Sequence, residues 1–118
     1  MAIREHSIYD CILSNAQNFA GETALVSGDL RLTFAEVPLH VNCLARGLRN
    51  TGFEKGDRIA VLLNNCAEYA LLLAACSRIG LIVVCLNTRT SADEMRKVLE
   101  STKPKALLFQ TSFEQQAE

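Results

Sequence analysis

The apolar positions of the first part of the chain switch between helical spacing and strand-like runs. In residues 8–20 they recur near the three- and four-residue spacing of one helical face, so we expect a short helix there. Residues 24–34 contain two apolar stretches joined by Ser27, Gly28 and Asp29. Turn-forming residues between two strand-forming runs predict a β-hairpin.

A second helix is predicted directly after the hairpin. Thr33 and Glu36 have the spacing of a capping box, in which paired side chains bind the first free backbone N–H groups of a helix. The apolar stripe of this helix consists of Val37, Val41, Leu44, Ala45 and Leu48. Gly52 is expected to end the helix in a left-handed conformation. Pro38 would fall just after the first turn, where its missing N–H predicts a local kink.

From residue 58 onward, short continuous apolar runs alternate with helical patterns. Residues 58–63 and 81–86 are typical of strands covered on both faces, and residues 105–109 are predicted to form a third strand. The order β-α-β-α-β predicts parallel strands joined by right-handed helical crossovers. The predicted fold class is therefore α/β: a partial parallel sheet, with the β-hairpin followed by β-α-β-α-β, and helices that cover it.

The boundaries of the two crossover helices follow from capping signals. Asn65 with Glu68, and Ser91 with Glu94, have the spacing of a helix cap and its partner. The first of these helices, residues 67–79, is apolar nearly all round, which predicts that it is buried. Gly80 is expected to end it, and Lys103 with Pro104 to end the second.

A further start signal lies at the end of the sequence. The pairs Thr111/Glu114 and Ser112/Gln115 both fit a capping box, but only about one turn of chain follows them. A helix that short does not hold in water without a partner. We therefore favour the interpretation that the chain is the N-terminal part of a longer protein. The alternative is that its last residues form a disordered tail.

Composition and charge exclude several classes of partner. The chain has 118 residues, enough for one small domain, and its net charge is -1 with scattered lysines and arginines. No basic field exists that would attract nucleic acid. The first ten residues lack the apolar core of a signal peptide, and residues 81–86, the longest apolar run after the first third, fall far short of the roughly 20 needed to cross a bilayer. We expect a cytoplasmic protein, without a transmembrane segment.

The five cysteines are spaced irregularly. They are Cys11, Cys43, Cys66, Cys76 and Cys85. Their number is odd, no CxxC or CxxH spacing occurs, and most lie in apolar runs. They are interpreted as small buried residues of a reducing compartment, and neither a disulfide framework nor a metal site is predicted.

Polar residues follow each predicted parallel strand. The carboxyl ends of parallel strands meet at one edge of a sheet, where open α/β folds bind their ligands. Asn64, Asn87 and Arg89 are the candidate cleft-lining residues at this edge, and a guanidinium there can clamp an anion. The alternative for Arg89 is pairing with a carboxylate or a backbone carbonyl. Asn65, Thr111 and Ser112 are explained by helix capping.

The catalytic signals of other nucleotide enzymes are missing. Neither GxGxxG nor GxxxxGK[ST] occurs, so no glycine-rich phosphate cradle is present. His6 and His40 have no neighbouring serine, cysteine or aspartate arranged as a dyad, and His40 is expected on the solvent face of its helix. We therefore predict no catalytic residue, no cofactor-binding loop and no metal ligand within the 118 residues.

The ordered motifs resemble the N-terminal region of the adenylate-forming enzymes, which include acyl-CoA synthetases, luciferases and peptide-synthetase adenylation domains. LTFAEV at 32–37 is similar to the family's L-T/S-Y-x-E-L motif, and residues 52–95 are similar to the block that follows it. The matching positions are Gly52, Gly56, Asp57, Asn65, Glu68, Gly80, Leu86, Asn87 and Arg89. The pattern Asn87-x-Arg89 favours the acyl-CoA synthetase branch, because the peptide-synthetase branch usually has aspartate at the first position.

Some positions depart from the family pattern. Cys85 stands where the family has a proline before Leu-Asn, and Asn64 and Ala67 also replace usual prolines. Pro38 is not usual in its helix. These changes affect the geometry of turns and leave the chemistry of the motifs in place.

The resemblance implies that residues 1–118 are the N-terminal portion of an incomplete AMP-binding large domain. The family's phosphate loop, its ribose-binding aspartate and its C-terminal lysine come later in a complete enzyme. For the whole enzyme only, the resemblance implies ATP, Mg²⁺, CoA and a carboxylic acid, which in this branch is a fatty acid. The chain's main partner is then the rest of its own polypeptide. Peripheral membrane contact is compatible with a long-chain acid, although no residue of the sequence argues for it.

Two other interpretations make different predictions. A stand-alone α/β binding module should unfold cooperatively without exposing apolar surface, whereas a piece of a larger enzyme should bind hydrophobic dyes or aggregate. A dinucleotide-dependent oxidoreductase is disfavoured, because Asn64, Asn65 and Cys66 follow the first parallel strand where such a site needs glycines.

Overall fold

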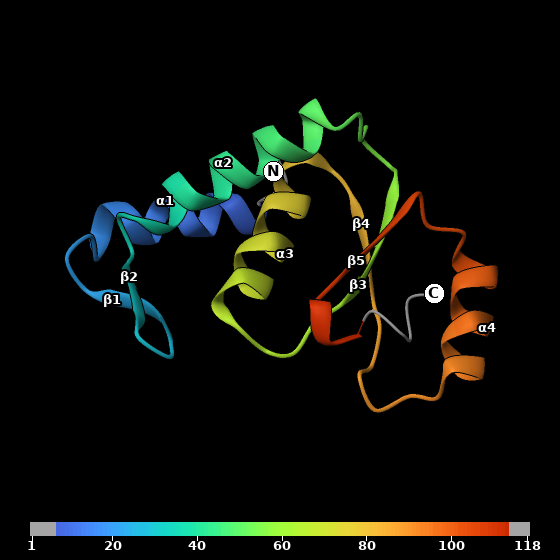
Figure 1. Cartoon of the computed structure of the whole chain (residues 1–118). Coiled ribbons are helices and arrows are strands. Elements are labelled where there is room, and N and C mark those ends of the chain that lie inside the picture. The colour runs from blue at the N-terminus through green and yellow to red at the C-terminus, as the bar shows by residue number, and fades with distance from the viewer. Residues whose placement is uncertain (1–6, 114–118) are drawn as a thin grey trace, which may run out of the picture.

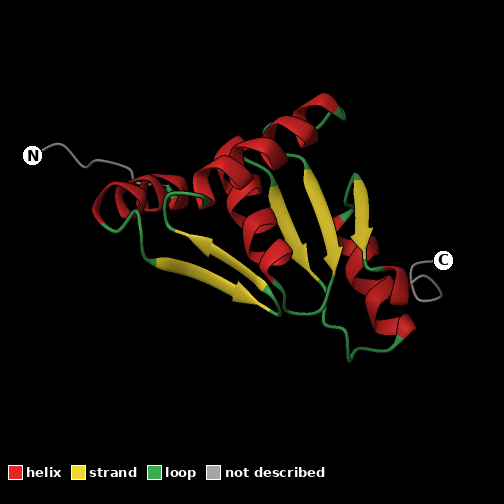
Figure 2. Ribbon diagram, turned by 60° about the vertical axis from the view of Figure 1, so that its left-hand side comes forward, coloured by secondary structure: helices red, strands yellow, loops and turns green. Residues whose placement is uncertain are grey.

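The computed structural model describes residues 7–113, which form four helices, five strands and a short terminal turn. The elements are α1 (Ile8–Asn18), β1 (Thr23–Ser27), β2 (Leu30–Thr33), α2 (Val37–Asn50), β3 (Arg58–Leu62), α3 (Ala67–Ile79), β4 (Ile82–Cys85), α4 (Ala92–Thr102), β5 (Ala106–Phe109) and a 3-10 turn (Thr111–Phe113). The β-hairpin and the three-stranded sheet lie on opposite sides of α3, and α4 lies on the far side of the sheet (Figures 1 and 2). The predicted order of elements is confirmed.

The three later strands form the predicted parallel sheet. Their order is β4-β3-β5, so β3 is the central strand and pairs on both sides, with Ile59 opposite Val83 and Ala106. Because side chains alternate along a strand, Ile59 and Val61 face the core that contains α3, while Ala60 and Leu62 face α4. The two crossover helices therefore cover opposite faces of the sheet.

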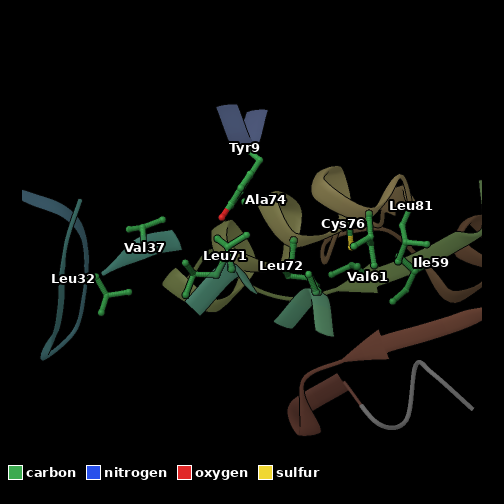
Figure 3. Packing of buried hydrophobic residues seen from close by; sticks show 14 residues of the cluster. Tyr9, Leu32, Val37, Ile59, Val61, Leu71, Leu72, Ala74, Cys76 and Leu81 are labelled. Carbon is green, nitrogen blue, oxygen red and sulfur yellow. The ribbon is translucent and has the colours of Figure 1, made fainter. Parts of the chain in front are cut away.

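The larger core joins α1, α2 and α3 to one face of β3. Figure 3 shows Tyr9 pointing from α1 toward Ala74 and Leu71 of α3, which also contacts the strand side chains Val61 and Ile59 in the same cluster. Tyr9 is only 6% exposed, and the guanidinium of Arg78 stacks over its ring at 3.8 Å from the centroid. The burial predicted for the apolar helix 67–79 is confirmed on most of its surface, although Leu73 remains 38% exposed.

The start of α2 differs from the prediction. Thr33 and Glu36 do form reciprocal hydrogen bonds: the Thr33 N–H donates to Glu36 Oε1 at 3.1 Å, and the Glu36 N–H donates to Thr33 Oγ1 at 3.3 Å. The hydrogen bond from the Thr33 backbone, and then the one from its side chain, holds the pKa of Glu36 below its ordinary value. They close a turn, however, and the helix begins only at Val37.

The expected kink at Pro38 is therefore wrong. Pro38 lies within the first turn of α2, where a backbone N–H has no partner inside the helix in any case. Its ring costs no hydrogen bond there, and its fixed φ suits the helix start. The end of α2 agrees with the prediction, because Gly52 follows it at φ 105° and its N–H donates to the Arg49 carbonyl.

The predicted cap of α3 is also wrong. Cys66, not Asn65, occupies the N-cap position, and no side chain binds the first N–H groups. At the other end Gly80 adopts the expected left-handed conformation, at φ 77°. For α4 the predicted start is confirmed by the Glu94 N–H, which donates to Ser91 Oγ, and its end by Lys103 at φ 47°.

The two outer strands are partly exposed. Within residues 7–113, β4 and β5 each pair on one side only, and Ile82, Leu108 and Phe109 are 49%, 38% and 40% exposed. The continuous apolar runs predicted that β3 and β4 are covered on both faces, which is correct for β3 and wrong for β4. The capping pairs at Glu114 and Gln115 lie outside the described residues.

The cysteines are likewise more exposed than predicted. Cys76 alone is fully buried, whereas Cys11, Cys43 and Cys85 are exposed and Cys66 is half-buried. Burial raises the pKa of the Cys76 thiol to about 11. The three exposed thiols lie on the solvent faces of helices or on an edge strand, positions that an apolar run by itself does not reveal. No helix in the described part of the chain is both long and apolar enough to cross a membrane.

A charged contact joins the loop before β3 to the start of β5. The Glu54 N–H donates to Asp57 Oδ2 at 2.8 Å, and Lys105 Nζ lies 3.1 Å from the same oxygen. Lys105 Nζ also donates to the Gly52 carbonyl at 2.7 Å. The Glu54 N–H first, and then Lys105, hold the pKa of Asp57 below its ordinary value.

This contact predicts a loss of stability in acid. Because the pKa of Asp57 is lower in the folded chain, its contribution is complete above the ordinary aspartate pKa of about 3.9 and is lost as the pH falls through the lowered value. Asp57→Asn should therefore flatten the dependence of the urea midpoint on pH below about pH 4. Asp93→Asn is the control, because its ion pair with Arg96 is long, at 3.8 Å, and exposed. Identical acid profiles for wild type and Asp57→Asn would contradict the assignment.

Candidate functional site

The carboxyl ends of the parallel strands meet at one edge of the sheet, as predicted. Backbone bonds fix the loops that leave it: the Leu86 N–H donates to the Val61 carbonyl at 2.9 Å, and the Gln110 N–H to the Leu62 carbonyl at 3.2 Å. Gln110 Oε1 in turn accepts from the Asn64 N–H at 2.8 Å. Three loops far apart in sequence are thereby held side by side.

A polar pocket of about 520 Å³ lies between the loops that follow β3 and β4. Its polar lining consists of Asn64, Asn65, Tyr69, Asn87, Thr88 and Arg89. The structure thus brings the three predicted cleft residues, Asn64, Asn87 and Arg89, into one pocket. The chain leaves β3 toward one face of the sheet and β4 toward the other, and such a divergence is where open α/β sheets form ligand crevices.

Asn87 and Arg89 have different parts in this pocket. The Asn87 Oδ1 atom accepts a hydrogen bond from the Arg89 N–H at 2.9 Å. This bond closes a local turn in the loop and occupies the amide oxygen. The Arg89 side chain is exposed and forms no ion pair with a carboxylate among residues 7–113. The carboxylate pairing considered for Arg89 is therefore not found among the described residues, which leaves its guanidinium open to an anion.

Tyr69 is a pocket residue that sequence reasoning missed. It lies in the first turn of α3, a helix whose sequence is apolar nearly all round. Burial raises its pKa to about 12, and a hydrogen bond with the Cys85 thiol acts in the same direction. The phenol therefore stays protonated at neutral pH and can donate a hydrogen bond. No sequence signal distinguishes it from a core tyrosine.

The chemistry of this pocket is that of a binding surface. Its polar groups are amides, a hydroxyl, a phenol and a guanidinium, which suit a carbonyl or an anion. It contains no carboxylate to hold a divalent cation and no base. Across residues 7–113, no group of three or more His, Cys, Asp or Glu side chains is arranged to hold a metal ion.

A larger groove, of about 820 Å³, lies between α2, α3 and the end of β5. Its walls are mostly apolar and include Leu44, Leu71, Leu72, Leu108 and Phe109. His40, which is exposed as predicted, lines it together with Cys43 and Cys66.

The sequence is similar to those of known ligases. Residues 13–118 match the family described as AMP-binding enzyme. The chain is 33% identical over 116 residues to the human mitochondrial protein named medium-chain acyl-CoA ligase ACSF2, a match that covers 97% of this chain and 19% of that protein. The chain spans less than a fifth of the length of the first curated relatives it matches.

Solved structures of the same class share the fold. The N-terminal domain of FACL13 from Mycobacterium tuberculosis superposes with a TM-score of 0.90 at 26% identity, over 96% of this chain and 29% of that one. The o-succinylbenzoate CoA synthetase of Bacillus subtilis, solved with its acyl-adenylate intermediate, gives 0.84 at 33% identity, over 93% of this chain and 28% of that one.

The fold and these relatives place the chain in the class of adenylate-forming acyl-CoA ligases. The chain belongs to the AMP-binding enzyme family, and its relatives are acyl-CoA ligases. The resemblance inferred from the ordered motifs is thereby confirmed.

Proposed function

We propose that residues 1–118 are the N-terminal portion of the AMP-binding large domain of an AMP-forming acyl-CoA ligase, and that the whole protein activates a fatty acid. The observation that carries the proposal is the 33% identity to an acyl-CoA ligase over nearly the whole chain. The Asn87-x-Arg89 pattern supports the acyl-CoA branch, and the name of the human relative supports an aliphatic acid.

In the whole enzyme two half-reactions are proposed. The substrate carboxylate attacks the α-phosphate of ATP, which forms an acyl-adenylate and releases pyrophosphate. The CoA thiol then displaces AMP. Mg²⁺, when bound, would neutralise charge on the phosphates. Since the edge pocket has no carboxylate, we assign the metal and the nucleotide to residues beyond this chain, and to Asn64, Asn87 and Arg89 the lining of the cleft.

The exposed surface supports the proposal that the chain is part of a larger polypeptide. In the part of the chain that the structure describes, both edges of the three-stranded sheet are unpaired, and the large groove beside β5 has mostly apolar walls. Unpaired edges and apolar patches of this kind are normally covered in a finished domain. The isolated chain should therefore bind a hydrophobic dye, and the longer polypeptide should not. A chain that unfolds cooperatively without binding dye would favour the stand-alone module instead.

The activity test is ATP–pyrophosphate exchange, measured with the chain alone and with the longer polypeptide that contains it. Octanoate and palmitate are the test acids, and 2-succinylbenzoate is the comparison acid. We expect exchange with a fatty acid by the longer polypeptide, and none above background by the chain alone.

The outcomes separate the parts of the proposal. Exchange by the chain alone would show that the activating chemistry lies within these residues, against the proposal. Exchange by the longer polypeptide only with 2-succinylbenzoate would keep the ligase class and overturn the fatty acid. No exchange with any acid, by protein that is folded, would overturn the enzymatic function.

A further inference from the structure

Three arginines gather at the edge of the molecule opposite the polar pocket. Arg46 and Arg49 of α2 and Arg78 of α3 line a pocket of about 500 Å³, together with Asn42, Ala45 and Ile79. Arg49 and Arg78 lie in the last turns of their helices. Arg78 is nine residues from Tyr69 along α3, or roughly 13 Å at 1.5 Å per residue, so the two pockets are separate sites.

The positive charge of this pocket is not balanced by the residues around it. No aspartate or glutamate lines it. None of the three arginines takes part in an ion pair within residues 7–113, where the ion pairs are Lys105 with Asp57 and Arg96 with Asp93.

The negative C-terminal ends of the two helices offset only part of the positive charge of the three arginines. A helix C-terminus carries roughly half a negative charge, so the two ends offset about one of the three positive charges. An excess of about two positive charges remains, which matches the charge of one phosphate group and exceeds that of a single carboxylate.

Two further features of the pocket favour the binding of an anion. Arg78 is held by stacking on the buried Tyr9 ring at 3.8 Å from the centroid, so its guanidinium has little freedom to lose on binding. In addition, Asn42 Oδ1 is buried and accepts no hydrogen bond in the described structure. A buried acceptor without a partner is costly. A hydrogen phosphate has both acceptor oxygens for arginine and one donor for such an amide.

We propose that the pocket formed by Arg46, Arg49 and Arg78 binds a phosphate-group anion. Guanidinium groups recognise phosphate through paired N–H donors, which is why arginines gather at such sites. The phosphate comes either from a soluble molecule or from an anionic lipid headgroup. The inference does not depend on the proposed ligase activity, because it uses none of the residues at the polar edge of the sheet.

The test is protection of arginine side chains from phenylglyoxal, read residue by residue by peptide mass spectrometry. Pyrophosphate is compared with sodium chloride at equal ionic strength, and phosphatidylglycerol vesicles with phosphatidylcholine vesicles. Arg31 and Arg96 are internal controls, since neither lines the pocket. Arg58 reports folding, because its Nη1 donates to the Thr102 carbonyl at 2.7 Å and should react faster in urea. A sample that fails this folding check is replaced by the longer polypeptide.

We expect pyrophosphate to slow modification of Arg46, Arg49 and Arg78 at least fivefold, and that of the controls less than twofold. Protection by phosphatidylglycerol vesicles alone would assign the phosphate to a lipid headgroup. Equal rates for pocket and control arginines in every arm would overturn the proposal.

A matched pair of variants gives an independent measurement. Arg49→Gln should weaken pyrophosphate binding about tenfold or more, as expected for the loss of a charge-assisted hydrogen bond. Arg96→Gln removes the same charge from α4, outside the pocket, and should leave the affinity within twofold. Equal affinities for the two variants would show that any binding reflects overall charge and not this pocket.

Discussion

Replacing Ile59 by alanine should lower the free energy of unfolding by roughly 2–5 kcal/mol, the usual cost of removing a large aliphatic side chain from a core. Ile59 lies on the central strand, is 2% exposed and packs in the cluster that joins α1, α2 and α3 to the sheet. The surrounding side chains come from several elements, so they cannot all move to fill the cavity. Urea unfolding followed by far-UV circular dichroism measures the change.

Ile82→Ala is the matched control for this prediction. Ile82 is the same residue type on the neighbouring strand, but it is 49% exposed. Its truncation should cost about 1 kcal/mol or less, because much of its surface is already in contact with water. Equal costs at the two positions would show that β3 is not the centre of the fold. A larger cost at Ile82 would mean that β4 is buried in the protein in solution.

Replacing Gly80 by alanine is expected to have the second large effect. Gly80 ends α3 at φ 77°, where its N–H bonds to the carbonyls of Cys76 and Ser77. A side chain in this conformation costs about 1–2 kcal/mol. A Cβ atom would also stand 2.7 Å from Lys55 Cγ, so that side chain must move. We expect a total loss of about 1–3 kcal/mol in the free energy of unfolding, measured by urea denaturation.

Gly47→Ala tests whether the stability loss expected for Gly80→Ala comes from the left-handed backbone of Gly80 and not from the added methyl group itself. Gly47 lies inside α2, and a Cβ there would meet no heavy atom within 4 Å. Alanine is a better helix former than glycine by about 1 kcal/mol, so this variant should be as stable as wild type or more so. A stability of Gly80→Ala that matches wild type would contradict the left-handed cap.

Much of the candidate site follows from sequence because it depends on local order. The alternation of apolar runs and helical patterns sets parallel strands, and parallel strands bring their carboxyl ends to one edge. Asn64, Asn87 and Arg89 could be placed at that edge without knowledge of any contact, and the structure gathers them in one pocket. Tyr69 could not, because its polar end is distinguished only by what packs around it.

The wrong predictions share one cause. Asn65 has the chemistry of a helix cap, Pro38 that of a helix breaker, and β4 the pattern of a covered strand. Each of these expectations correctly describes the preference of the local sequence. The actual helix starts, at Val37 and after Cys66, depend on where the chain must turn to pack on the sheet. Exposure of β4 and β5 depends on how many strands stand beside them.

The sequence by itself determined the fold class, the order of elements, the family motifs and the edge at which polar residues collect. Periodicity and spacing are properties of neighbouring residues, so one chain is enough to read them. Only the tertiary structure decided which strand is central, which thiol is buried and that Arg46, Arg49 and Arg78 share a pocket. Those features arise between segments distant in sequence, whose distances are set by the packing of helices on the sheet.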